Sequence, residues 1–243
     1  MVNYLRQQSV GDLIRNTFSI YGRGFGVIFL TYFLPLFPVN LCVTEAQMAG
    51  AKGLYWLGLF VSVFVSLIAC GAITISVSDI CLGNKPSVAR SYGKIFGKML
   101  GKLFVANLLQ TAFVFIGLIL LIVPGVIAAV WLFLTPSVVM LEGLGGMNAL
   151  KRSKALGQGF YWRNFGVLLL VIVICGVLGG ILGAILGALF GAMLGNFGFR
   201  LIYVLAQTLS GPLSLIAIVL LYYDLRVRKE AYDAAALAED LRR

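Results

Sequence analysis

Residues that could carry out chemistry are few in this sequence, and their types exclude most kinds of catalytic site. The 243 residues include no histidine, so Ser-His-Asp triads, imidazole acid/base catalysis and His-ligated metal sites are excluded. The four cysteines lie dispersed in or beside apolar runs, without the Cys-x-x-Cys spacing of zinc or redox sites: Cys42, Cys70, Cys81 and Cys175. We therefore predict buried thiols, no catalytic residue, no metal site and no cofactor, and we expect a protein that is not an enzyme.

Three carboxylates stand alone at the ends of apolar stretches: Asp79, Glu142 and Asp224. A carboxylate at the edge of a membrane is costly unless it is paired. We expect each of them to form a salt bridge near the membrane surface, the candidate partners being Arg15, Arg23, Arg163 and Arg226. The functional alternative is a proton or cation relay, which we favour less because no acid lies in the middle of a predicted span.

A basic row, Arg90, Lys94, Lys98 and Lys102, repeats every four residues along one face of an amphipathic helix predicted over 87–104. Like charges at this spacing cost about 0.2–0.5 kcal/mol per pair, whereas anionic headgroups return about 1 kcal/mol per basic residue. Contact with anionic lipid is therefore expected. Ordinary anchoring by basic residues is the simpler interpretation, and binding of a specific phosphorylated headgroup is the alternative. No nucleic-acid motif accompanies these charges, so nucleic acid is not an expected partner.

A glycine ladder recurs at four-residue intervals in the fifth apolar stretch: Gly179, Gly183, Gly187, Gly191 and Gly195. Small residues on one helical face allow another backbone to approach closely within lipid. The ladder therefore predicts close helix packing. We favour a partner helix in the same chain, and the alternative is a seam between copies in a homo-oligomer.

The composition identifies the class of protein that must position these residues. The chain is 60% hydrophobic and only 12% charged, too poor in polar residues to cover a soluble globule. Its long neutral stretches exceed the roughly 20 residues that cross a hydrocarbon core. Proline followed by glycine at 124–125 divides the longest stretch, and 164–199 holds either one long helix or a span followed by an interfacial segment. We predict one all-α membrane domain over 1–243, with six spans at 25–44, 54–79, 103–123, 126–141, 165–190 and 201–223, and a short tail at 224–243.

The bias of basic residues predicts the topology. Counted against the six spans, 17 of the 19 Lys and Arg residues fall on one side, and only Lys52 and Arg200 on the other. This places both termini in the cytoplasm of a multi-pass protein of the bacterial inner membrane. The first residues also lack the apolar core and cleavage site of a signal peptide.

A unit composed of a basic amphipathic helix followed by two spans occurs three times. The three helices are predicted over 9–22, 87–104 and 147–161, each lying in the cytoplasmic interface. Short matches support a common origin, since Ser-Val at 9–10 recurs at 87–88 and Phe-Gly-Val at 25–27 recurs at 165–167. A threefold repeat of this unit is therefore our hypothesis.

Three segments carry a resemblance to a known family: SVGDLIRNTFSIY from Ser9, PG at 124–125 continuing to EGLGGMNALKRS from Glu142, and LYYDLRVR from Leu221. Over about residues 8–230 the chain resembles the bacterial family related to the membrane domain of glycerophosphoryl diester phosphodiesterase. The resemblance implies a multi-span inner-membrane protein without an assigned activity, because catalysis in that family belongs to a separate soluble barrel. Only 13 residues follow Glu230 and histidine is absent, so no catalytic residue carries over.

Two functions from different classes follow. We favour a non-enzymatic membrane component that associates with anionic lipid or a membrane-protein partner. The alternative is a transporter or accessory permease subunit for a lipid-like or small amphipathic molecule, and a lipid-modifying enzyme is least favoured. A solid core with an external apolar groove favours the first function, whereas a membrane-depth cavity favours transport.

Overall fold

The chain folds as an all-α membrane protein, as predicted. The computed structural model describes residues 4–242, except for the side chains of residues 98 and 191–194, and these residues form helices joined by turns, with no strand. Six helical segments are long and apolar enough to cross a membrane. They are Phe25–Met48, Lys52–Cys81, Leu100–Leu120, Ile122–Glu142, Tyr161–Phe190 and Gly195–Glu230. The predicted boundaries differ from these by up to seven residues.

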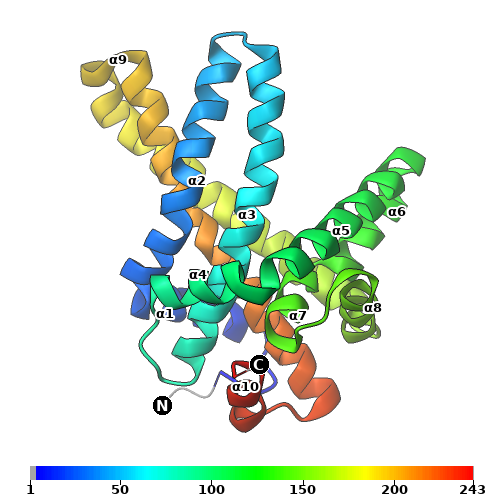
Figure 1. Cartoon of the computed structure of the whole chain (residues 1–243). Coiled ribbons are helices and arrows are strands. Elements are labelled where there is room, and N and C mark those ends of the chain that lie inside the picture. The colour runs from blue at the N-terminus through cyan, green and yellow to red at the C-terminus, as the bar shows by residue number, and fades with distance from the viewer. Residues whose placement is uncertain (1–3, 243) are drawn as a thin grey trace.

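The first unit is a short basal helix followed by an upright hairpin (Figure 1). Helix α1 (Val10–Arg23) begins at Ser9, whose hydroxyl accepts the Asp12 amide at 3.1 Å, and it ends at Gly24. Helices α2 (Phe25–Met48) and α3 (Lys52–Cys81) then pack along each other, joined by a turn in which Gly50 takes a φ of +68°. Glycine is favoured at a positive φ because it has no Cβ that would clash with the backbone.

The second unit has no break between its basal helix and its first span. Helix α4 (Val88–Lys94) continues through a π-helical segment, η1 (Ile95–Met99), directly into α5 (Leu100–Leu120). A π-helical turn holds more residues than an α-helical turn, so it shifts the register of the faces on either side. The predicted basic row over 87–104 therefore does not lie on one continuous α-helical face.

The turn after α5 lies at Leu121, three residues before the predicted position. Helix α6 (Ile122–Leu132) begins immediately, and a short break separates it from α7 (Thr135–Glu142). Pro124 is accommodated in the first turn of α6, where an amide would lack a helical partner. Gly125 does not form the turn. It lets α6 approach α5 closely, since a Cβ placed on Gly117 of α5 would lie only 2.8 Å from the Cα of Gly125.

The third unit contains the longest helix. Helix α8 (Gly146–Gly157) leads into α9 (Tyr161–Glu230), which reverses at Gly195 with φ +65° and ψ −171°, a backbone conformation essentially restricted to glycine. The chain continues as a helix up to this point, so 164–199 holds a long helix and no separate interfacial segment. The last helix, α10 (Ala234–Asp240), returns to the base of the bundle (Figure 1). The element order matches the predicted threefold unit, and equivalence of the three copies stays a prediction.

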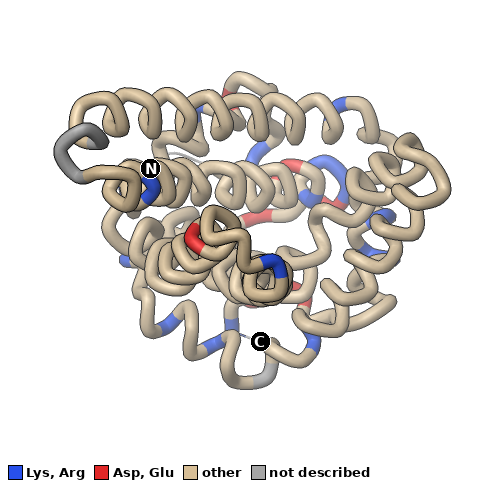
Figure 2. The backbone as a smooth tube through the Cα atoms, turned by 90° about the horizontal axis from the view of Figure 1, so that it is seen from above, with Lys and Arg blue, Asp and Glu red and all other residues tan. Residues whose placement is uncertain are grey.

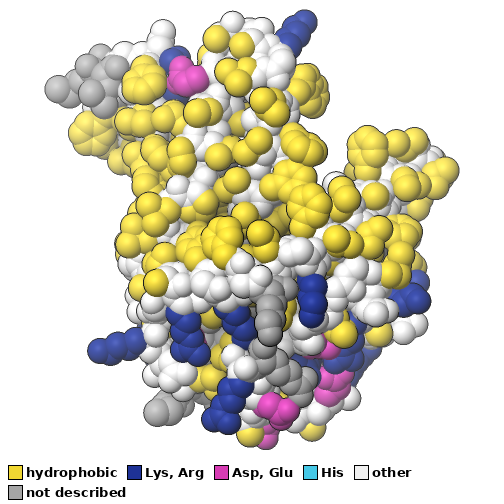
Figure 3. All heavy atoms as spheres, viewed as in Figure 1, with side chains coloured by type: hydrophobic (Ala, Val, Ile, Leu, Met, Phe, Trp, Pro, Cys, Tyr) yellow, Lys and Arg dark blue, Asp and Glu magenta, His cyan; other side chains and the backbone are white. Residues whose placement is uncertain are grey.

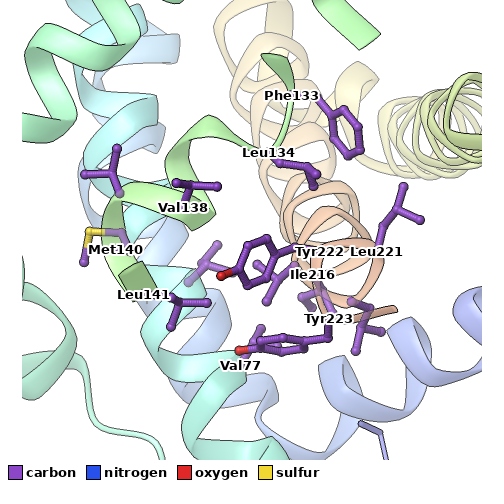
Figure 4. Packing of buried hydrophobic residues seen from close by; sticks show 14 of the residues in the cluster. Val77, Phe133, Leu134, Val138, Met140, Leu141, Ile216, Leu221, Tyr222 and Tyr223 are labelled. Carbon is purple, nitrogen blue, oxygen red and sulfur yellow. The ribbon is translucent and has the colours of Figure 1, made fainter. Parts of the chain in front are cut away.

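The core lies where α3, α7 and the second half of α9 meet (Figure 4). Residues 69–79 of α3 and 135–141 of α7 are buried throughout. Tyr222 and Tyr223 are fully buried and pack beside Val77 and Leu141 (Figure 4). This part of the molecule is a filled core.

Charge is concentrated at one end of the bundle, where α3, α7 and α9 end. We call this the charged end. Figure 3 shows Lys and Arg side chains gathered there, below a surface dominated by hydrophobic side chains. Seen from above, most Lys and Arg residues lie around the outside of the bundle and most acids lie toward its middle (Figure 2).

Candidate functional site

Asp224 lies at the centre of one group of charges, which we call the Asp224 cluster. Its side chain is completely buried and forms ion pairs with Arg163 at 2.7 Å and Arg228 at 2.9 Å. The amide of Gln8 donates to the same carboxylate at 2.6 Å, and the carbonyl of Gln8 accepts from both arginines. The cluster therefore joins the segment before α1 to both halves of α9.

Glu142 belongs to a second group, the Glu142 cluster, in which opposite charges alternate. Glu142 accepts from Arg152 at 2.7 Å and from the hydroxyl of Tyr222 at 2.9 Å. Arg152 also pairs with Glu230, which pairs with Arg226 at 2.9 Å. Arg226 pairs in turn with Asp240 of α10 at 2.7 Å, and Tyr232 donates to the same carboxylate. These contacts join α7, α8, α9 and α10.

The pairing is visible in the pKa values of residues outside the spans. Burial alone would lower the pKa of Arg152, but its hydrogen bonds and charge contacts with Glu142 and Glu230 outweigh burial and raise that pKa. Burial, followed by the hydrogen bond to Asp240, raises the pKa of Tyr232. Near neutral pH, Arg152 therefore stays charged and Tyr232 stays neutral and keeps the proton that it donates.

Asp79 has a weaker environment than the other two acids. Its carboxylate is fully buried and lies 3.2 Å from Arg90, whose side chain is 55% exposed. Among the described residues, neither carboxylate oxygen has a hydrogen-bond partner of good geometry. Within the described part of the chain, Arg163 is the one candidate partner of the four that pairs with one of the three acids. Arg15 pairs with Asp12, Arg23 lies over the ring of Tyr4, and Arg226 pairs with Glu230 and Asp240.

The residues of the basic row have different partners and do not form one binding surface. Lys94 is half-buried and donates to the carbonyl of Leu241 at 2.9 Å, and burial followed by the charge of Arg90 lowers its pKa. Lys102 donates to the carbonyl of Gly143 at 2.8 Å, just after the end of α7. The side chain of Lys98 is outside the described part of the structure. The row was predicted to face lipid, but two of its members bind backbone carbonyls of this chain.

The glycine ladder faces the second half of α9. A Cβ on Gly179 would lie 2.8 Å from the hydroxyl of Ser210, one on Gly183 would lie 3.2 Å from Tyr203, and one on Gly187 would collide with the ring of Phe199. The surroundings of Gly191 are outside the described side chains. Gly195 differs from its predicted role, since nothing lies within 4 Å of it and it forms the reversal of the chain.

An apolar groove opens between the α5–α6 hairpin and the start of α9. It has a volume of about 580 Å³. Its lining residues on α5 include Gln110 and Thr111, α6 contributes Ala129, Phe133 follows directly after α6, and α9 contributes Phe165. A second cavity of about 360 Å³ shares Val126 and Phe165 with it and continues toward the tip of the hairpin. We call the two together the groove.

Helix α8 places basic residues against α6, at Trp131, which does not line the groove. The ammonium of Lys154 lies 4.0 Å from the ring centroid of Trp131, a cation–π contact. The Ser153 hydroxyl donates to the carbonyl of Trp131 at 2.8 Å, which holds α8 against α6. Lys151 and Lys154 are both exposed. The groove thus offers an apolar lining, and α8 offers exposed cations that are not among its lining residues.

Sequence reasoning missed several residues that build this end of the molecule. Gln8, Glu230 and Asp240 were not singled out, and the tail was not expected to fold. One signal was present for the tail, because Asp233 precedes a run of alanines and caps α10 by accepting from the Ala236 amide at 2.9 Å. The cysteines are all free, and the expectation of buried thiols is wrong for Cys42, which is exposed on α2.

Comparisons with known proteins support the class but no activity. No family model matches the chain, and no solved structure matches it significantly. A UPF0259 membrane protein of Pectobacterium carotovorum subsp. carotovorum (strain PC1) is 30% identical over 102 residues. The alignment covers 42% of this chain and 40% of the length of that curated relative. The likeness supports a multi-span integral membrane protein.

Proposed function

We propose that this protein is a non-enzymatic component of the bacterial cytoplasmic membrane that binds anionic lipid, with an acyl chain in the groove and the headgroup at the exposed lysines of α8. The charged end then faces the cytoplasm, because 17 of the 19 basic residues belong to that side of the six segments. This orientation puts both ends of the described chain in the cytoplasm.

The observation that carries the proposal is the groove. Its volume lies within the range of about 300–1,000 Å³ that is usual for small-molecule sites, and its lining is mainly aliphatic and aromatic. In a bilayer, such a surface contacts acyl chains. Gln110 and Thr111 supply the polar groups of the larger cavity, and Tyr161 and Trp162 supply those of the smaller one.

The headgroup contact rests on α8 and not on the basic row. Lys151 and Lys154 are exposed, whereas Lys94 and Lys102 bind carbonyls of the chain. Each basic residue near an anionic membrane surface contributes about 1 kcal/mol to association. Lys154 is already held over Trp131, so less side-chain freedom is lost on binding.

Transport is the less supported function. The region between α3, α7 and α9 is a filled core, and the groove lies outside it, on the surface of the bundle. Such an arrangement suits a protein that holds a lipid at its side better than one that moves it through its centre.

We also propose kinship with the membrane-domain family named above. The segments that carry the resemblance contribute α1, Glu142 with Arg152, and Tyr222 with Asp224. These residues meet in the two ionic clusters of the charged end. The kinship implies a shared membrane scaffold and no catalysis by this chain.

The proposal is tested by the thermal stability of the purified protein in neutral detergent. We expect phosphatidylglycerol to raise Tm more than phosphatidylcholine with the same acyl chains, since only a bound ligand stabilises the folded state in this way. Replacing both Lys151 and Lys154 by alanine removes the difference between the lipids, whereas Lys52→Ala at the opposite end keeps it. Equal stabilisation of the wild type by the two lipids refutes the proposal.

A further inference from the structure

The tip of the α5–α6 hairpin is apolar throughout. No side chain from residue 112 to residue 130 carries a hydrogen-bonding group, and the turn at Leu121 lies in the middle of this run. The residues at the tip are also strongly exposed, with Leu121 at 69% and Ile122 at 74%. Such a surface is stable in hydrocarbon and costly in water.

The other two hairpins have polar tips. The turn between α2 and α3 is flanked by Glu45, Gln47 and Lys52, and the reversal in α9 is followed by Asn196 and Arg200. Arg200 forms a bidentate ion pair with Glu45, at 2.6 and 2.9 Å, which ties these two tips together at the end opposite the charged end. Polar side chains therefore mark the two turns that suit water on the far side, and the α5–α6 tip has none of them.

The α5–α6 hairpin is also inclined. Helix α5 has 21 residues, but α6 ends after 11 residues and measures about 16 Å, about half of a hydrocarbon core of about 30 Å, before the break that leads into α7. The hairpin splays away from α2 and α3, and its tip lies at a lower level than their turn (Figure 1). Ile122 and Val123 share a cavity with Tyr161 and Trp162, the first two residues of α9.

The position of these α9 residues fixes the depth of the tip. Arg163 follows directly and belongs to the Asp224 cluster at the charged end. A helix residue next to this cluster is near the surface at which α9 enters the membrane. The hairpin tip beside it therefore lies in the half of the bilayer adjacent to the charged end.

The backbone of the turn suits this location. Hydrocarbon offers no partner to backbone amides, so a turn within it must leave few of them free. The Leu121 amide donates to the carbonyl of Gly117 at 3.0 Å, and the Gly125 amide donates to Leu121 at 3.4 Å. Pro124 has no amide hydrogen. Of the four positions that open α6, only Ile122 and Val123 thus keep an amide without a helical partner.

We propose that α5 and the α6–α7 pair form a re-entrant hairpin, which enters the membrane from the charged end, turns within the hydrocarbon and leaves at the same end. The chain then crosses the membrane four times, through α2, α3 and the two halves of α9. The two ends of the chain stay on the same side of the membrane, because the number of crossings is even whether this hairpin crosses or is re-entrant. The groove opens into the leaflet next to the charged end.

A spin label reports the depth of the tip. In a chain whose four cysteines are replaced by serine or alanine, Leu121→Cys is labelled and the protein is reconstituted in bilayers, with Gln47→Cys as the matched label at the α2–α3 turn. We expect the label at 121 to be accessible to oxygen and protected from a water-soluble nickel reagent, with a depth between the midplane and the charged-end surface, and the label at 47 to be accessible to nickel. Nickel accessibility at 121 equal to that at 47 overturns the proposal.

A charge substitution gives a second test in the otherwise native chain. Leu121→Lys places a cation inside the hydrocarbon if the hairpin is re-entrant, and at a water-facing turn if the hairpin crosses. We expect Leu121→Lys to lower the yield of folded, monodisperse protein severalfold, whereas Gln47→Lys leaves it unchanged. Equal yields for the two variants contradict a re-entrant hairpin.

Discussion

Burial decides what each charged side chain at the charged end does. The Asp224 carboxylate is fully buried and contacts two arginines and one backbone amide. The Glu142 carboxylate is 13% exposed, and the fully buried Asp79 carboxylate has one half-exposed arginine as its partner. Buried ion pairs add little net stability relative to apolar packing, but removing one partner leaves the others uncompensated. The three acids therefore act as fixed joints between helices.

Replacing Asp224 tests this joint. Asp224→Asn leaves Arg163 and Arg228, which are 21% and 23% exposed, without their counter-charge, and breaking a fully buried pair costs about 3–5 kcal/mol, which is an upper bound here. We expect a marked fall in Tm, measured by thermal denaturation in neutral detergent. The matched control is Asp12→Asn, because Asp12 is paired with an Arg15 side chain that is 71% exposed, and it changes Tm little. Equal effects of the two variants would show that the Asp224 cluster is not a structural joint.

The sequence predicts that the three acids need basic partners, but it does not predict which basic residues these are. A lone acid at the end of an apolar stretch signals a salt bridge. Its partner depends on which helices meet, and Arg163 lies 61 residues from Asp224 along the same helical element. Arg15 and Arg23 were candidates because they belong to the first basic helix, but Arg15 pairs with Asp12 and Arg23 lies over the ring of Tyr4.

At the scale of elements, glycine spacing determines how closely helices approach. The two halves of α9 pack with the ladder of the first against the larger side chains of the second, and Gly117 does the same for the α5–α6 hairpin. Both contacts lie within one chain. The spacing predicted close packing, whereas the choice of partner followed from the reversal at Gly195, whose backbone angles no pattern of hydrophobicity reveals.

A leucine in the ladder tests this packing. Gly187→Leu forces a side chain into the ring of Phe199, and overpacking of this kind costs about 1–3 kcal/mol. We expect Tm to fall while the oligomeric state, measured by light scattering, is unchanged. Gly180→Leu is the control on the same helix, because nothing lies within 4 Å of a Cβ there, and its Tm stays near the wild-type value. A change of oligomeric state in Gly187→Leu alone would instead favour a seam between copies.

Helix α10 provides a third prediction. Leu237 is fully buried against the core, and a buried Leu→Ala change costs about 2–5 kcal/mol. Because α10 is a helix of only seven residues joined to α9 by a short turn, we expect Leu237→Ala to expose the segment after Glu230 to limited proteolysis before the spans unfold. Ala235→Ser, at an exposed position of the same helix, leaves the cleavage rate unchanged. Resistance of Leu237→Ala to proteolysis would show that α10 is secured by the ionic contacts of Asp240.

At the scale of the whole molecule, composition predicted a membrane protein, and the placement of Lys and Arg predicted a charged end. The arrangement of the helices could be seen only in the structure. A hydrophobicity pattern reports how long a helix is and not whether it crosses, so it cannot distinguish a crossing α5–α6 hairpin from the re-entrant hairpin that we propose. The turn was misplaced at Pro124 because proline is also tolerated in the first turn of a helix. The groove results from the splay of this hairpin, which no local sequence signal records.

The most direct test of the central proposal is native mass spectrometry of the protein released from neutral detergent with an equimolar mixture of phosphatidylglycerol and phosphatidylcholine. We predict that the wild type retains one phosphatidylglycerol. Ala129→Phe, which fills the groove, loses it, whereas Ala112→Phe on the exposed face of α5 keeps it. Equal retention of the two lipids by the wild type, or undiminished retention of phosphatidylglycerol by Ala129→Phe, would contradict a lipid site in the groove.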